Sequence, residues 1–185
     1  MKQDKVPEVL KALRDLTGSQ VLVGIPASTT ERESEGGSDM TNSELGYIHE
    51  FGSPAANIPA RPFLIPGVEK SLDRATHQLE LAAKAAFKGD ATAMDMRLEM
   101  AGQIAATGAK REISYGDFIP LKPSTIRNRR RGRRTKSMRA AEQQYLTLVA
   151  GGMSEEDAQS AAGIRPLIDT GALRNSITSV VRKRK

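Results

Sequence analysis

The chain has 185 residues, a length that suits one domain spanning residues 1–185. Apolar residues make up 38% and aromatic residues 4%, so we expect a modest, mainly aliphatic core. The absence of cysteine excludes a disulfide framework, a thiol nucleophile and a thiolate metal site. The two histidines, His49 and His77, lie 28 residues apart and offer little for a zinc site or a serine–histidine relay. We therefore expect no cofactor, no metal and no enzymatic activity.

Hydropathy gives no reason to expect a membrane partner. No apolar run approaches the roughly 18 residues that a membrane span needs. Residues 1–13 contain acidic side chains and no long apolar stretch, so they do not resemble a signal peptide. We expect a soluble protein that is made inside the cell.

The net charge of +6 is unevenly distributed. Residues 1–110 carry a net −3 and residues 111–185 a net +9, and residues 127–139 alone hold eight basic side chains and no acid. Counterion release favours contact between such a run and a polyanion. The sequence equally permits a solvated loop or an interface with an acidic protein. The candidates for contact with DNA or an acidic partner are Arg127, Arg129, Arg130, Arg131, Arg133, Arg134 and Lys136.

The amino-terminal part predicts a short helix over residues 6–16, followed by a strand over residues 20–25. Residues 26–40 are polar and without periodicity, and we interpret them as a mobile loop that orders against a partner. Thr41 or Asn42, with Glu44, forms a capping box that opens a helix ending near Gly52.

A proline-rich connector leads from this helix to a helical hairpin. The first arm begins at Phe63, and its helical apolar stripe includes Leu72, Leu79 and Phe87. Gly89 interrupts the pattern, and residues 91–109 form the second arm. Short helices are predicted near Ser124, over residues 140–150 and from Ser154 to Gly163, before a closing strand around residues 177–181.

These elements predict an α+β fold in which a small antiparallel sheet packs against a long α-hairpin. The core comprises residues 5–25, 41–112 and 164–183, and residues 118–163 form a basic, partly helical insertion. A two-stranded sheet is marginal in water. Either further short strands or neighbouring subunits complete it.

One catalytic possibility lies at Asp169-Thr170-Gly171-Ala172, a pattern found in aspartic proteases. That chemistry needs two carboxylates sharing a proton, which one copy supplies only by dimerising. Only 14 residues follow Gly171, too few for the second half of such a fold. The preferred interpretation is a turn that Asp169 or Thr170 caps and in which Gly171 adopts an unusual φ.

Two clusters are more specific as a pair. The first is His49-Glu50-Phe51-Gly52 with Ile58-Pro59-Ala60-Arg61-Pro62-Phe63-Leu64, and the second runs from Pro166 through Leu-Ile-Asp-Thr-Gly-Ala-Leu-Arg-Asn-Ser to Ile177. Their order, and the helices between them, resemble the tail-completion or neck (virion morphogenesis, head–tail joining) proteins of long-tailed bacteriophages. The resemblance spans roughly residues 42–180. Residues 138–163 match no pattern of that family, and the basic run is longer than the family leads one to expect.

The resemblance implies a structural virion protein without catalytic activity. It implies a ring of six or of twelve copies around the DNA passage, in contact with head-connector and tail proteins, in the neck or tail of the virion. The motif residues that would build the fold and its interfaces are Glu50, Phe51, Gly52, Pro59, Arg61, Pro62, Phe63, Asp169, Thr170, Gly171, Leu173 and Ser176.

Physical considerations give several of these residues a structural task. Pro59 and Pro62 fix the approach of the chain to the hairpin, and Phe63 anchors it. We expect Arg61 to pair with Glu50, and Leu173 to pack inward. The alternative function is a free-standing nucleic-acid-binding protein that uses residues 127–139, although no aromatic stacking platform accompanies them.

Overall fold

A computed structural model describes residues 6–27, 40–131 and 136–183 of the chain. The predicted α+β class is confirmed: most of the chain is helical, and the described part contains one two-stranded antiparallel sheet. The elements are α1 (Val6–Thr17), β1 (Ser19–Gly24), α2 (Asn42–Phe51), the 3-10 helix η1 (Pro54–Ala56), α3 (Leu64–Glu69), α4 (Leu72–Phe87), α5 (Ala91–Tyr115), α6 (Pro123–Arg131), α7 (Lys136–Ala150), α8 (Glu155–Ala161), α9 (Ala172–Ser176) and β2 (Thr178–Lys183).

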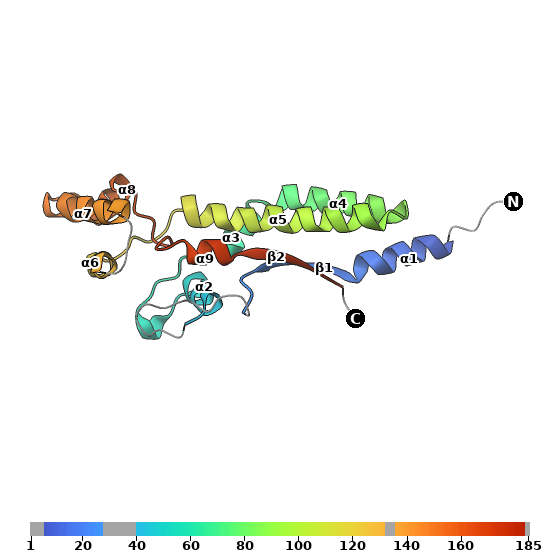
Figure 1. Cartoon of the computed structure of the whole chain (residues 1–185), viewed down its shortest axis with the longest axis horizontal. Helices are drawn as coiled ribbons and strands as arrows, with labels where there is room; N and C mark the ends of the chain where they lie inside the picture. The colour runs from blue at the N-terminus through green and yellow to red at the C-terminus, as the bar shows by residue number, and fades with distance from the viewer. Residues whose placement is uncertain (1–5, 28–39, 132–135, 184–185) are drawn as a thin grey trace.

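The molecule is elongated (Figure 1). Helices α4 and α5 lie side by side along the long axis, and the sheet runs along this hairpin. Helices α6, α7 and α8 group beyond one end, whereas α1 continues the line of the sheet toward the other. The predicted loop over residues 26–40 falls mostly outside the described residues. None of the described helices is long and apolar enough to cross a membrane.

The two strands pair over six residues, with Leu22 opposite Val180. Their inner face packs on α5, where Gly102 lies so close that an added Cβ would come 2.8 Å from the Ser179 side chain. On the outer face Leu22 and Val180 are exposed by 43% and 47%. Both predicted strands are confirmed, and each outer edge is left unpaired within the described residues.

Alanines and glycines form the hairpin contact. Ala75, Ala82 and Ala86 of α4 are buried, and α5 buries Met94 and Leu98 against the last two of them. The predicted first arm is divided at Lys70-Ser71 into α3 and α4. Where α3 crosses α5, a Cβ on Gly67 would lie 2.5 Å from Ala109 Cα, so these two backbones touch.

Three large apolar residues of the stripe predicted for the first arm are not part of this contact. Leu72, Leu79 and Phe87 are exposed by 53%, 40% and 52%, because α4 turns its alanines toward α5 instead. His77 is also exposed.

Residues 118–163, predicted as a basic insertion, contain α6, α7 and α8, which share a core of their own. That core consists of Leu121, Ile126, Tyr145, Ala158 and Ala162. The short helices predicted over residues 140–150 and from Ser154 are confirmed as α7 and α8.

Candidate assembly site

The first motif begins on α2, whose amino terminus is fixed by a capping box. Thr41 Oγ1 accepts a hydrogen bond from the Glu44 backbone N–H, and Glu44 Oε2 accepts one from the Thr41 N–H at 2.8 Å. The bond from the Thr41 N–H, together with one from the Thr41 hydroxyl to Glu44 Oε2 at 2.9 Å, lowers the pKa of the exposed Glu44 carboxyl. The helix ends at Gly52, whose φ of 77° suits glycine. The predicted capping box and helix end are confirmed.

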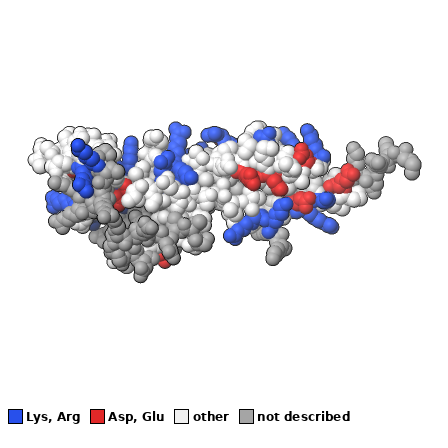
Figure 2. Space-filling model, viewed as in Figure 1, with Lys and Arg blue, Asp and Glu red and all other residues white. Residues whose placement is uncertain are grey.

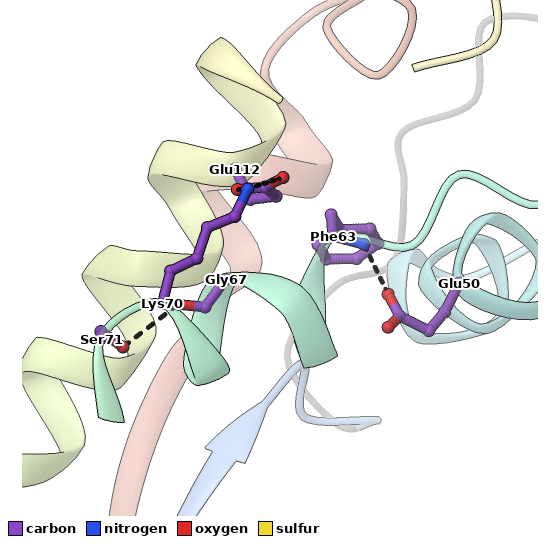
Figure 3. A network of polar contacts seen from close by, with 6 residues as sticks. All are labelled: Glu50, Phe63, Gly67, Lys70, Ser71 and Glu112. Carbon is purple, nitrogen blue, oxygen red and sulfur yellow. Dashed lines mark hydrogen bonds and ion pairs between the residues drawn. The ribbon is translucent and has the colours of Figure 1, made fainter. Parts of the chain in front are cut away.

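Glu50, near the end of α2, caps the next helix. Its carboxylate accepts a hydrogen bond from the backbone N–H of Phe63 at 2.8 Å (Figure 3). It also accepts hydrogen bonds from the N–H groups of Leu64 at 2.8 Å and of Ile65 at 2.9 Å. The first N–H groups of a helix have no partner within the helix, and they carry the positive end of its dipole. Glu50 is therefore the anion that holds α3 against α2.

The predicted Glu50–Arg61 pair is wrong. The guanidinium of Arg61 instead donates from Nε to the Ile119 carbonyl at 2.8 Å and from Nη2 to the Pro120 carbonyl at 3.1 Å. The physical reason is that three backbone donors already occupy the Glu50 carboxylate, whereas a planar guanidinium fits two consecutive carbonyls. Burial lowers the pKa of Arg61, which is only 6% exposed.

The two motif segments meet in one core. Phe63 from the first motif and Leu173 from the second are 1% and 5% exposed, and both belong to a cluster with Ile177. Gly46 of α2 faces this cluster, and a Cβ there would lie 2.7 Å from Ile25 Cδ1. The inward orientation predicted for Leu173 is confirmed.

The second motif forms a turn before α9. Gly171 has a φ of 82°, in the left-handed region that favours glycine, and Thr170 Oγ1 accepts a hydrogen bond from Ala172 N at 3.3 Å. Ser176 Oγ donates to the Leu173 carbonyl at 2.8 Å. The predicted turn through Gly171 is confirmed.

Asp169 borders a pocket of about 160 Å³ between this turn and α2, with His49 and Arg129 on its wall. Among the described residues that line the pocket, Asp169 is the one carboxylate. An aspartic-protease dyad would require a second carboxylate beside it. In the part of the chain that the structure describes, no group of three or more histidine, aspartate or glutamate side chains could hold a metal.

The basic run divides into side chains with different tasks. Arg129 is partly buried and donates to the carbonyls of Pro166 at 2.8 Å and Ile168 at 3.4 Å, so it holds the second motif against α6. Arg127 and Lys136 are exposed. Arg133 and Arg134 lie outside the described residues, and the side chains of Arg130 and Arg131 are likewise not described.

The remaining motif residues lie around α2. Phe51 is exposed by 58% and stacks on Tyr47 with ring centroids 4.9 Å apart. Pro59 and Pro62 lie in the extended segment before α3, which Arg61 N holds to the His49 carbonyl at 2.7 Å.

Sequence reasoning missed the pair of hydrogen bonds between the Gln159 side chain and the Leu121 backbone. The Gln159 side chain accepts from Leu121 N at 2.9 Å and donates to Leu121 O at 2.8 Å, as a neighbouring strand would. A glutamine in a short polar helix carries no sequence signal for this contact. The exposed apolar faces of the molecule were also missed, although the helical spacing of their residues was visible.

Comparison with known proteins gives no match among family models, curated proteins or solved structures.

Proposed function

We propose that this chain is a structural protein of the neck of a long-tailed bacteriophage, which completes the tail or joins it to the head as a ring around the DNA channel. The sequence resemblance supplies the class of protein. One structural observation supports a role in assembly: sixteen large apolar side chains are exposed among the described residues, and seven of them lie on α1 and α4. Exposed apolar patches are typical of surfaces that contact another protein.

The charge distribution is compatible with this role. Figure 2 shows basic side chains over much of the visible face, with acidic ones gathered mainly in the half that contains α1 and the strands. Subunits whose charged surfaces differ from one end to the other suit a head-to-tail interface. The exposed basic side chains of residues 127–139 would face DNA in the channel or an acidic neighbouring ring.

The test is electron microscopy of particles from the parent phage with this gene interrupted, complemented by the wild-type gene or by variants. We expect full heads with separate or abnormally long tails, and restoration by the wild-type gene. Normal, joined, infectious virions would refute the proposal. They would favour the alternative, a basic nucleic-acid-binding protein.

A charge-removal variant tests the role of the basic run. It leaves Arg129 in place, because Arg129 holds the second motif, and it changes Arg127, Arg130, Arg131, Arg133 and Arg134 to Gln. A matched control removes five basic charges from the hairpin: Arg74, Lys84, Lys88, Lys110 and Arg111. We expect loss of joining or DNA retention with the first variant only. Intact particles with both variants would exclude a functional contact by the run.

A further inference from the structure

Helix α1 presents more apolar surface than the described part of its chain covers. Ala12 is 8% exposed and, with Leu16, packs against α4 and α5. Val6, Leu10 and Leu13 are instead exposed by 58%, 48% and 40%. At about 100° per residue these three lie within about 60° of one another, in a stripe about 10 Å long. The stripe adjoins the buried side of the helix, so it extends the core rather than forming an isolated patch.

Helix α4 has a second stripe of the same kind. Leu72, Leu79 and Phe87, described above as exposed, lie with the half-buried Ala83 within about 80° of one another. The stripe is about 22 Å long, and it lies beside the alanines that α4 buries in the hairpin. Two helices of one chain therefore leave a long apolar face uncovered.

The charges next to the two stripes are opposite in sign along the first turns of α4. Arg14 follows the α1 stripe around the helix, and Asp73 and Glu80 follow the α4 stripe in the same rotational sense, with Lys84 beyond them in the last turn. The side chains of Arg14, Asp73 and Glu80 are exposed. Borders on the same side of two stripes face each other when the helices run antiparallel, so an antiparallel α1–α4 contact would place Arg14 beside the two acidic residues.

We infer that the occupant of the α4 stripe is the α1 helix of a second copy of this chain, packed antiparallel. Because the two stripes lie on different elements, the contact is head-to-tail, and it closes a ring when its rotation permits. The inference rests on the proposed function in taking the ring as the assembled form, and it names the surface that joins its subunits.

The first test is the association of the purified full-length chain, measured by sedimentation across a range of concentrations. We expect oligomers for the wild type and at least about tenfold weaker association for a Leu10→Asp, Leu13→Asp double variant. Met96→Asp is the matched control, because Met96 is 53% exposed on α5 and outside both stripes. A wild type that stays monomeric, or a double variant that associates like the control, would overturn the inference.

Charge exchange tests the pairing. Arg14→Asp and Asp73→Arg should each weaken association, and the variant carrying both should recover it. If the double variant is weaker than either single variant, the two residues do not face each other.

Cross-linking tests the geometry of the contact. The chain contains no cysteine, so an introduced cysteine is its only thiol. A mixture of Leu10→Cys and Leu79→Cys proteins should form cross-linked dimers that neither protein forms alone. Dimers of Leu10→Cys with itself would instead show an α1–α1 contact and refute the head-to-tail arrangement.

The two levels of inference fail separately. If the chain associates through α1 and α4 but virions are normal after gene interruption, the proposed neck function is refuted and the proposed interface is not. If gene interruption causes a joining defect but the purified chain is monomeric, the proposed interface is refuted and the proposed neck function is not.

Discussion

Replacing Glu50 with Gln tests whether the first motif is held together by the capping carboxylate. The wild-type carboxylate is 7% exposed and accepts three backbone hydrogen bonds at the start of α3. Glutamine has one acceptor oxygen, and its amide group would face N–H donors. Hydrogen bonds to a charged group contribute about 1.5–3 kcal/mol each, and part of this is retained, so we expect a loss of about 2–4 kcal/mol.

The assay is urea unfolding at neutral pH followed by circular dichroism. With a slope of about 2 kcal/mol per molar urea, the midpoint should fall by about 1–2 M. Glu44→Gln is the matched control, because it also removes a carboxylate that caps a helix, but from an exposed position. A Glu50→Gln midpoint within experimental error of the Glu44→Gln midpoint would refute the assigned role of Glu50.

Three further changes test other parts of the fold. Gly67→Ala should destabilise the chain by about 3 kcal/mol, because the added Cβ would collide with the backbone of α5. Gly24→Ala is the control and should not destabilise it, because no atom lies within 4 Å of a Cβ at that position. Equal unfolding midpoints for the two variants would contradict this expectation. Arg129→Lys should increase proteolysis near residues 164–171, whereas the control Arg127→Ala should not. The cleavage sites are identified by mass spectrometry of the fragments. The same cleavage in both variants would contradict the structural role of Arg129. Burial raises the pKa of Tyr145, so its contribution to stability is complete below the unfolded value of about 10 and is lost as pH rises through the higher folded value. Tyr145→Phe should therefore remove the latest step of the tyrosinate absorbance titration and lessen the alkaline loss of stability.

Local sequence signals predicted the elements whose causes are local. The Thr41–Glu44 capping box, the stop at Gly52 and the turn at Gly171 depend on side-chain chemistry within a few residues. The β-branched content of the strands was also sufficient. The partners of Glu50 and Arg61 were not predictable in this way, because they lie up to 59 residues away in sequence.

Hydrophobic spacing located the helices but not their buried faces. In α4 the large residues Leu72 and Leu79 dominate the apolar pattern, yet the hairpin buries the alanines beside them. A sequence rule that assigns the largest apolar residues to the core fails where two helices approach closely. The same exposed residues of α4 form the surface on which we propose that a neighbouring copy packs.

Hydrogen bonds between distant segments and small side chains in the hairpin help to hold this chain together, while sixteen large apolar side chains are exposed among the described residues. Glu50, Arg61, Arg129 and Gln159 each fix a backbone segment distant in sequence. An isolated copy should thus be only modestly stable, and association should stabilise it by mass action. We expect the thermal midpoint to rise with protein concentration for the wild type and to stay constant for the Leu10→Asp, Leu13→Asp variant. A midpoint independent of concentration in both proteins would show that the exposed stripes contribute nothing to stability through association.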